Sequence, residues 1–518
     1  MRLLHEKLKY SAMKFPDRCA IMHQEDSLTY AKVWEMVHSF ANWLSENMER
    51  GARVAICIEN RPEMVYCLFA IPAAGMIAVP VEPNIHEKNL SYILNDCNVE
   101  VIVTSCTQMD KIANSYNNLN LKTIILCDKK NEISKDGVSI LSFNDLIKGP
   151  INSTKLDLVK SSEKDTAVIL YTTGTTGPKK GVRLSHFNLL SATKNINQFM
   201  QLHEEVVESL PMPLSHSFGF GRLRAVFDVG GTVILENGLI RPEWVLFNID
   251  KYQANSFSSV PAGFEILLNG FFNEKFKKIA RNLRFIEIGS SFMRNEHKKL
   301  LMEYCPEAKI CMHFGLTEAS RSAFIEFHSE KSFLHTVGRP SPGVSIKVCD
   351  ENGNLLADNT PGDILIKGDM VMQGYWKNDE YSNKTLRDGW LHTGDLGFMD
   401  ENGYLHLQGR KEDIINIGGL KVGPREVEEV LLRFDGILDV TVVAATSTDI
   451  DNVNSQIIRA YLVVAEKTKF ADFKELKRFC LAEMEAYKVP REFVILDSLT
   501  KTESGKIKRD LLEKKWTN

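Results

Sequence analysis

The sequence predicts an α/β protein: a large N-terminal domain of parallel or mixed sheets covered by helices, a β-rich subdomain, and a small, mobile C-terminal α+β domain. Short apolar runs alternate with helical patterns through the first half of the chain. Between residues 350 and 409 glycines become frequent and the apolar runs shorten. A compact segment of about 100 residues follows, which is a usual domain size. At 518 residues the chain is too long for one typical core.

The first half of the chain has a β-α-β rhythm. Apolar, β-branched runs predict strands at residues 53–58, 77–81, 99–103 and 122–126. Helical spacing follows the first of these runs, and Pro62 stands near its start, where proline is favoured. Strands that are apolar throughout and alternate with helices are typical of parallel sheets covered on both faces.

The C-terminal segment has its own pattern of elements. The spacing predicts helices at 425–433 and 471–484 and strands at 438–444 and 458–464. The polar, charged residues 409–413 precede it and are suited to a linker. We therefore expect two domains, residues 1–409 and residues 410–518.

Composition narrows the class of protein. Lysine and arginine number 63 and aspartate and glutamate 67, so the net charge of −4 gives no sign of a nucleic-acid or anionic-membrane partner. The ten cysteines form no CxxC pair, and several lie in apolar runs, which favours buried free thiols and a cytoplasmic location. An apolar run near 20 residues is missing, as is a signal-peptide pattern, so no membrane span is expected.

Residues 171–181 form the most informative segment. The sequence Tyr-Thr-Thr-Gly-Thr-Thr-Gly-Pro-Lys-Lys-Gly follows an apolar run at 166–170 that predicts a buried strand. Hydroxyls, flexible backbone N–H groups and ammonium charge at a strand end suit a polyphosphate. Ser185 is a good N-cap for a helix at 186–199, so we expect strand, loop and then helix. The alternative is a plain turn, and the segment is not a Walker motif.

Further motifs recur after this loop in a fixed order. They are Gly-Ser-Ser at 289–291, His-Phe-Gly-Leu-Thr-Glu at 313–318, Trp-Leu-His-Thr-Gly-Asp at 390–395 and Thr-Lys-Thr-Glu-Ser-Gly-Lys-Ile at 500–507. Together with residues 171–181 they resemble the adenylate-forming superfamily over nearly the whole chain. That superfamily holds acyl-CoA synthetases, aryl-acid ligases, adenylation domains of peptide synthetases and luciferases.

The resemblance implies a nucleotide site. The phosphates would meet the loop and a lysine, for which Lys180 is preferred over Lys179. Thr317 would also contact phosphate. Glu318 would hold Mg²⁺, a hard cation that prefers oxygen ligands. Asp395 and Arg410 would reach the ribose. The full set implied for ATP and AMP is Thr172, Thr173, Gly174, Thr175, Thr176, Lys180, Gly289, Ser290, Ser291, His313, Phe314, Gly315, Asp395 and Arg410. Taken singly, these motifs also fit helix caps and turns.

The resemblance also assigns roles in the C-terminal domain. Lys506 matches the catalytic lysine of the terminal motif, although a lone lysine in a polar loop is usually solvated. Glu412 occupies the hinge position, where the family usually has Asp or Lys. Gly419 and Lys421 match a loop beside the incoming thiol, and a turn between two strands is an equal alternative for Lys421.

Residues 211–219 resemble the acid-binding motif of the same superfamily. His216 would lie near the substrate carboxylate, with Ser217 and Phe218 beside it. Amino-acid-activating relatives carry an aspartate near this point and this chain does not, which disfavours an α-amino acid. In a helix Phe218 and Arg222 share a face. Arg222 is therefore predicted to point into the pocket and select a polar or anionic tail, the alternative being a surface arginine.

These residues predict an ATP-dependent acid–thiol ligase. It would activate a small carboxylic acid as acyl-AMP, release pyrophosphate with the help of Mg²⁺, and pass the acyl group to coenzyme A. Three alternatives are kept: transfer to the phosphopantetheine of a free-standing acyl carrier protein, a luciferase-like oxidase, and an inactive nucleotide-binding protein. The presence of Lys506, Glu318 and Asp395 counts against loss of activity.

Overall fold

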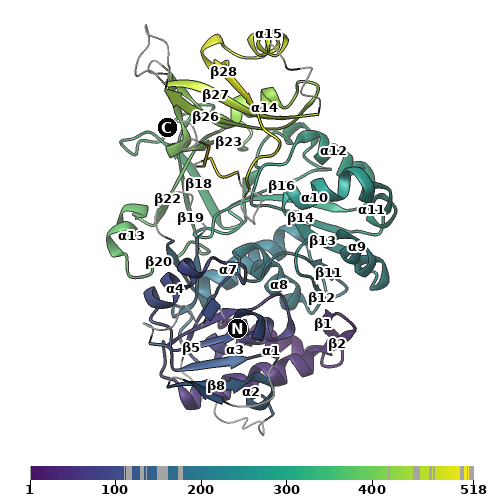
Figure 1. The fold of residues 1–518 in the computed structure, drawn as a ribbon, viewed down its shortest axis with the longest axis vertical. Helices are drawn as coiled ribbons and strands as arrows, with labels where there is room; N and C mark the ends of the chain where they lie inside the picture. Colours follow the sequence, from purple (N-terminus) through teal and green to yellow (C-terminus); the bar gives the residue numbers. More distant parts are fainter. Residues whose placement is uncertain are drawn as a thin grey trace.

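The structure is a computed structural model in which the chain forms an elongated molecule, with the N-terminal part at one end of the long axis and the C-terminal domain at the other (Figure 1). It describes residues 2–109, 111–112, 120–128, 133–135, 137–148, 161–172, 179–417, 420–446, 456–465, 470, 473–501, 507–509 and 511–512. Within these residues the predicted α/β class is confirmed.

One nine-stranded sheet lies in the N-terminal part, in the order β20-β10-β9-β4-β3-β5-β6-β8-β7. Its central strands pair in parallel and are apolar on both faces, as the sequence predicts. The strands are β3 (Arg53–Cys57), β4 (Ile77–Pro80), β5 (Val101–Thr104), β6 (Thr123–Leu126), β7 (Ile133–Lys135), β8 (Val138–Ser142), β9 (Thr166–Tyr171), β10 (Gly181–Ser185) and β20 (Gly374–Tyr375).

A second nine-stranded sheet follows the order β17-β16-β15-β14-β13-β11-β12-β1-β2. From β13 through β15 its strands are parallel, so their carboxyl ends meet at one edge, where α/β proteins bind ligands. The strands are β1 (Cys19–His23), β2 (Asp26–Thr29), β11 (Val207–Leu210), β12 (Thr232–Leu235), β13 (Ser256–Ser259), β14 (Phe285–Ile288), β15 (Lys309–Phe314), β16 (Ala323–Glu326) and β17 (Arg339–Pro340).

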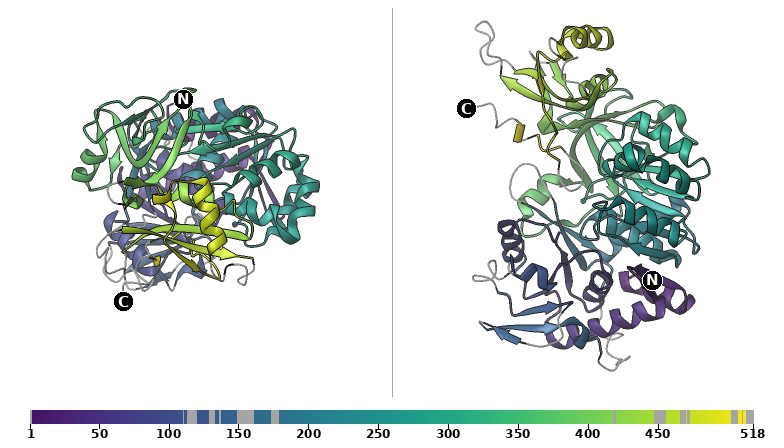
Figure 2. Two further views of the ribbon diagram at one scale, coloured as in Figure 1. Left: turned by 90° about the horizontal axis from the view of Figure 1, so that it is seen from above. Right: turned by 45° about the vertical axis from the view of Figure 1, so that its right-hand side comes forward.

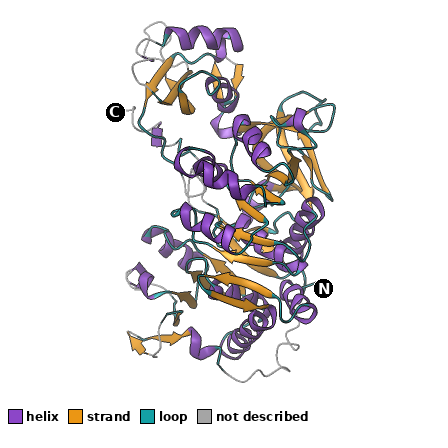
Figure 3. Ribbon diagram, turned by 90° about the vertical axis from the view of Figure 1, so that its right-hand side faces the viewer, coloured by secondary structure: helices purple, strands orange, loops and turns teal. Residues whose placement is uncertain are grey.

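Helices fill the space between the two sheets and cover their outer faces (Figures 1 and 3). In the inner layer Phe69 of α3 stacks on Phe227 of α8, with ring centroids 5.8 Å apart. The helices of this domain are α1 (Leu4–Lys14), α2 (Tyr30–Asn47), α3 (Pro62–Ala73), α4 (Glu87–Asp96), α6 (Phe143–Leu146), α7 (His186–Met200), α8 (Ser217–Val229), α9 (Pro242–Lys251), α10 (Pro261–Leu268), α11 (Asn273–Ala280), α12 (Asn295–Tyr304) and α13 (Asp379–Thr385).

A smaller sheet forms the predicted β-rich subdomain. It contains β18 (Val344–Cys349), β19 (Gly362–Gly368), β21 (Leu386–Arg387), β22 (Trp390–Met399) and β23 (Leu405–Arg410). The C-terminal domain lies beyond β23 at the end of the molecule (Figure 2). It holds β24 (Ile415–Ile417), β25 (Leu420–Val422), α14 (Pro424–Leu431), β26 (Ile437–Thr446), β27 (Gln456–Val464), α15 (Lys474–Glu483) and β28 (Glu492–Ile495).

One local prediction, the strand–loop–helix geometry around the phosphate loop, is wrong. The loop joins β9 to β10, which pair antiparallel, so the segment is a β-hairpin. The helix begins only after β10, where Ser185 caps α7 by accepting a hydrogen bond from the Asn188 N–H. The cap is as predicted, but a whole strand separates it from the loop. The N-terminus of α7 therefore does not supply donors to the loop.

The buried thiols agree with expectation. All ten cysteines are free, and eight of them, Cys57 and Cys127 included, are buried. Among the described residues, helices are too short or too polar to cross a bilayer.

Gly338 connects the second sheet to the β-rich subdomain. Its C=O accepts a hydrogen bond from the Leu405 N–H at 2.8 Å, and the Val337 N–H donates to the Leu405 C=O at 3.0 Å. Its φ is +90°, and a Cβ placed there would lie 1.8 Å from the Phe324 backbone oxygen. Only glycine fits, because both the backbone conformation and the space exclude a side chain.

We expect Gly338→Ala to lower the free energy of unfolding by about 3 kcal/mol or more, since left-handed strain adds to overpacking. Gly353 is the matched control, because its φ is +85° but nothing lies within 4 Å of a Cβ placed there. Gly353→Ala should lower the free energy of unfolding by only about 1 kcal/mol. Urea-unfolding midpoints of both variants measure this. Equal shifts would contradict the close packing at Gly338.

Candidate active site

The base of the phosphate loop is fixed by α4. Thr172 and Lys180 face each other across the hairpin, with the Thr172 N–H donating to the Lys180 C=O at 3.0 Å. The Tyr171 hydroxyl donates to the Asp96 carboxylate, and the Tyr92 hydroxyl donates to the Lys179 C=O at 3.1 Å. Of the predicted loop residues, Thr173, Gly174, Thr175 and Thr176 lie outside the described part of the chain.

Two tyrosines that sequence reasoning missed connect Lys180 with Glu318. The Lys180 ammonium lies over the Tyr381 ring, 3.6 Å from its centroid, and the rings of Tyr381 and Tyr375 are 5.0 Å apart. The Tyr375 hydroxyl donates to Glu318 Oε1 at 2.8 Å. Burial, together with the Glu318 charge, raises the pKa of Tyr375, which stays a protonated donor. The run Gly-Tyr-Trp at 374–376, which begins with the strand that pairs with β10, was the sequence signal that could have pointed to Tyr375.

Glu318 is suited to hold a magnesium ion. It follows Thr317 in the turn after β15, and its C=O accepts from the Met372 N–H at 2.9 Å, which fixes the backbone. Both Thr317 and Glu318 are partly exposed. In the described residues His, Cys, Asp and Glu side chains do not group in threes that could hold a metal by themselves. That fits Mg²⁺, which typically takes one or two carboxylates and completes its shell with phosphates and water.

Asp395 and Arg410, both predicted to reach the ribose, form an ion pair. They are directly opposite each other in β22 and β23, with Arg410 Nε 3.0 Å from Asp395 Oδ1. Thr393 fixes both: its C=O accepts from Arg410 Nη1 at 2.9 Å, and its Oγ1 accepts from the Asp395 N–H at 3.0 Å. The carboxylate is 5% exposed. A nearly buried, oriented carboxylate can accept hydrogen bonds from vicinal hydroxyls.

The Gly289–Ser291 segment and the His313–Gly315 segment lie together. The first follows β14 and the second includes the end of β15, neighbouring parallel strands of the second sheet. A Cβ at Gly289 would lie 2.0 Å from the His313 ring, so glycine is needed for this contact. Ser290 adopts the left-handed conformation, with φ +76°. These two segments, both predicted to belong to the nucleotide site, thus lie together at the edge of the sheet where α/β proteins usually bind ligands.

His216 stands at the start of α8 and faces a carboxylate. Its Nε2 lies 3.4 Å from Glu82 Oε2, and the Ser215 hydroxyl donates to the same oxygen at 2.8 Å. Although burial raises the pKa of Glu82, the contacts with His216 and Ser215 hold it below its usual range. Asn60 fixes the segment before α8, since its amide donates to the Met212 C=O and its oxygen accepts from the Leu214 N–H.

The prediction that Arg222 points into the acid pocket as a free cation is wrong, and so is the surface alternative. The Arg222 side chain is fully buried between α8 and the second sheet. Its Nη2 lies 2.6 Å from Glu208 Oε2 and its Nη1 lies 3.3 Å from Glu287 Oε2. The guanidinium is already neutralised by two carboxylates. Arg222 is therefore not available to pair with an anionic tail, and Ser217 and Phe218 lie in the first turn of α8 beside His216.

The remaining predicted residues are in the C-terminal domain. Glu412 lies in the single turn Lys411–Asp413 that directly follows β23. Only the backbone of Lys421 is described, in β25. Gly419 and Lys506 lie outside the described residues, and among the described ones Lys501 and Ile507 form an antiparallel bridge.

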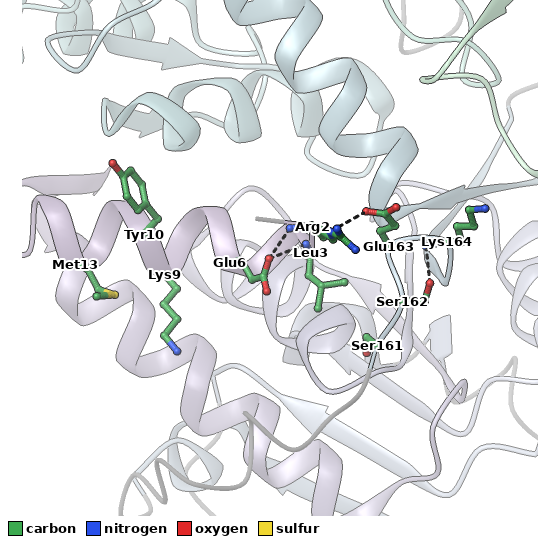
Figure 4. A pocket seen from close by; sticks show the side chains of 10 residues that line it. All are labelled: Arg2, Leu3, Glu6, Lys9, Tyr10, Met13, Ser161, Ser162, Glu163 and Lys164. Carbon is green, nitrogen blue, oxygen red and sulfur yellow. Dashed lines mark hydrogen bonds and ion pairs between the residues drawn. The ribbon is translucent and has the colours of Figure 1, made fainter.

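An open groove elsewhere on the molecule is unrelated to this site. It lies between α1 and residues 161–164, where Arg2 and Glu163 form an ion pair of 3.9 Å (Figure 4). None of the predicted site residues lines it.

Comparisons with known proteins agree with this geometry. The family model described as AMP-binding enzyme matches residues 8–376, and that of the AMP-binding enzyme C-terminal domain matches residues 426–506. The chain is 30% identical to a long-chain-fatty-acid–CoA ligase of Bacillus subtilis, covering 100% of this chain and 95% of that protein. It is 29% identical to a medium-chain fatty-acid–CoA ligase of Escherichia coli, covering 97% of this chain and 88% of that protein.

Solved structures show the same architecture. ATP-bound MatB from Rhodopseudomonas palustris has a TM-score of 0.88 and 25% identity, covering 100% of this chain and 99% of that one. O-succinylbenzoate coenzyme A synthetase of Bacillus subtilis, in complex with AMP, has a TM-score of 0.82 and 24% identity, covering 98% of this chain and 97% of that one. The chain therefore belongs to the AMP-binding enzyme family and, through it, to the AMP-forming ligases of the adenylate-forming superfamily.

Proposed function

We propose that the protein is an ATP-dependent acid–thiol ligase that joins a carboxylic acid to AMP, releases pyrophosphate and passes the acyl group to coenzyme A. The observation that carries the proposal is the meeting of Lys180 and Glu318 around Tyr375. The lysine proposed to meet phosphate and the carboxylate proposed to hold Mg²⁺ are far apart in the sequence and lie close to the same tyrosine. The relatives named as fatty-acid–CoA ligases support coenzyme A as the acceptor.

The chemistry explains why these groups are needed. A free carboxylate is a poor acyl donor to a thiol, because oxide is a poor leaving group, whereas a mixed anhydride with AMP has a good one. The protein must bring two anions together and stabilise the charge that develops on pyrophosphate. Positioning and electrostatic stabilisation supply most of the rate in such phosphoryl chemistry.

The residues predicted to bind the nucleotide and the acid would act together in the first step. Lys180 and the hydroxyls of the loop would hold the phosphates, and Asp395 with Arg410 would hold the ribose. Bound Mg²⁺ would neutralise charge on the departing pyrophosphate, with Glu318 as the side chain that holds it. Lys506 would bridge the acid carboxylate and the α-phosphate as they meet, and His216 would orient the carboxylate.

The second step requires the thiol to replace Lys506. Rotation of the C-terminal domain about Glu412 would withdraw the lysine and bring the loop with Gly419 and Lys421 to the site. Two half-reactions in one site are commonly served by such a domain movement. The polar turn Lys411–Asp413 directly after β23 is a suitable place for it.

An acid panel with ATP and Mg²⁺, assayed for pyrophosphate with and without coenzyme A, tests the proposal. AMP and pyrophosphate should appear in the presence of a suitable acid, and a thioester should appear when coenzyme A is added. Production of ADP would contradict the proposal. A thioester that forms only with a phosphopantetheinylated carrier protein would assign the acceptor to the carrier instead.

The variant Lys506→Ala separates the two steps. Loss of the bridging ammonium should lower the rate of acyl-adenylate formation by about 10²–10³. Transfer from supplied acyl-adenylate to coenzyme A should persist, because the lysine has no part in it. Lys508→Ala is the matched control from the same terminal segment and should leave both rates unchanged. Equal loss of both half-reactions in Lys506→Ala would count against the domain rotation.

The variant Tyr375→Phe tests the metal role of Glu318. Without its hydrogen bond Glu318 is less well oriented, so the Mg²⁺ concentration for half-maximal activity should rise by about tenfold. Tyr404→Phe is the matched control, because the Tyr404 hydroxyl makes an equivalent 2.8 Å hydrogen bond to Glu330 away from the site. Its Mg²⁺ dependence should stay as in the wild type. An unchanged Mg²⁺ dependence in Tyr375→Phe would remove the assignment.

A further inference from the structure

A buried ion cluster lies directly behind the acid-binding end of α8. The carboxylate of Glu287 is its centre: Oε1 lies 2.7 Å from His313 Nδ1 and 3.0 Å from Arg321 Nε, and Oε2 lies 3.3 Å from Arg222 Nη1. Glu208 completes the cluster through Arg222. Apart from His313, the side chains are at most 1% exposed.

The cluster packs against the first turn of α8, next to the proposed position of the acid carboxylate. His216 starts α8, and Phe218 in the first turn lies edge-on to the His313 ring at 4.8 Å and under Arg321 at 5.0 Å. A tail that leads inward from a carboxylate at His216 along the buried face of α8 would pass Phe218 and reach Arg222, one turn further along the helix. The space there already holds Arg222 with both of its carboxylate partners.

The cluster resists displacement by hydrocarbon. Although burial raises the pKa of Glu287, Arg321 and His313 hold it well below its usual range, so the carboxylate stays charged. A long apolar chain would have to separate these ion pairs without supplying new partners. Leaving a buried charge unpaired is strongly unfavourable. The cluster therefore closes the inner end of the pocket.

The Glu287 cluster carries no net charge that would attract an ionic tail. Two guanidinium groups, Arg222 and Arg321, face two carboxylates, Glu208 and Glu287. Burial lowers the pKa of His313, which favours the neutral imidazole. Arg224, the other buried cation of α8, lines a separate small cavity between α1, α3 and α7.

Ser258 supplies a polar group beside the Glu287 cluster. It lies in β13 opposite Glu287, and it is two residues from Ser256, whose hydroxyl contacts Glu208; its side chain therefore faces α8. It is fully buried, and its hydroxyl has no hydrogen-bond partner among the described residues. Ser258 is also nearer than Ser256 to the carboxyl end of the strand, where ligands bind. A buried hydroxyl without a partner is costly, so a ligand atom is a fitting partner.

We propose that the pocket accepts short acids with a neutral, hydrogen-bonding tail, that the Glu287 cluster sets its depth, and that Ser258 binds the tail's hydroxyl or carbonyl oxygen. This rests on the proposed function for the position of the carboxylate. The short acid proposed here differs from the long-chain and medium-chain acids in the names of the related ligases.

Turnover of defined acids tests the pocket depth. 3-Hydroxybutanoate, butanoate, octanoate and palmitate are compared by kcat/KM for pyrophosphate release. The two four-carbon acids should exceed octanoate and palmitate by at least about 100-fold, and the hydroxy acid should exceed butanoate. Turnover of octanoate or palmitate equal to or above that of the short acids would overturn the proposal.

Binding of stable acyl-adenylate mimics judges the pocket independently of catalysis. The probes are acylsulfamoyl adenosines with 3-hydroxybutanoyl, butanoyl or decanoyl tails, measured by calorimetry. The 3-hydroxybutanoyl probe should bind tightest and the decanoyl probe weakest, and the reverse order would overturn the proposal. This order holds whether or not any acid is turned over. Failure of every acid to give AMP would count against the proposed function, not against the pocket.

The variant Ser258→Ala tests the hydroxyl. Affinity for the 3-hydroxybutanoyl probe should fall by roughly tenfold, while affinity for the butanoyl probe stays constant. Ser209→Ala is the matched control: Ser209 is buried with an unpartnered hydroxyl, but as the neighbour of Glu208 in β11 it faces the other side of the sheet. Ser209→Ala should change neither affinity. Identical behaviour of the two variants would overturn the role of Ser258.

Discussion

The carboxylate of Glu287 is the interaction on which the geometry of the large domain depends. It contacts Arg222 of α8, Arg321 beyond β15 and His313 at the end of β15, and so ties a helix and two sheet segments to one point. His313 packs on the glycine that follows the Glu287 strand. The nucleotide side and the acid side of the site are thereby fixed relative to each other. Removing one member of such a buried cluster leaves a charge without its partner.

The proximity of Asp395 and Arg410, both proposed to bind the nucleotide, follows from local signals in the sequence. Asp395 lies in a short run of recognisable residues, and its partner Arg410 falls opposite it as soon as β22 and β23 pair. Arg222 was not predictable in the same way. Its partners Glu208 and Glu287 are 14 and 65 residues away, and only the packing of α8 on the sheet reveals them. A helical pattern tells which face a residue is on, but not what covers that face.

Strand β10 and Tyr375 escaped prediction for related reasons. Strand β10 has only five residues and follows a glycine-rich loop. A pattern this short does not distinguish a strand from the last residues of a loop. Tyr375 is 57 residues from Glu318, so no local spacing joins them. Both become evident when β10 pairs with β9 on one side and β20 on the other. That pairing places Tyr375 between Lys180 and Glu318.

The contact between Lys180 and Tyr381 has an energetic consequence for nucleotide entry. The ammonium rests on an aromatic face rather than on a carboxylate. Exposed contacts of that kind are worth about 0.5–1 kcal/mol. Among the described residues no carboxylate forms an ion pair with Lys180, so under the proposed function a triphosphate would replace a weak partner of this lysine with a strong one. The aromatic ring holds the ammonium in position and leaves nearly all of its charge available to such an anion.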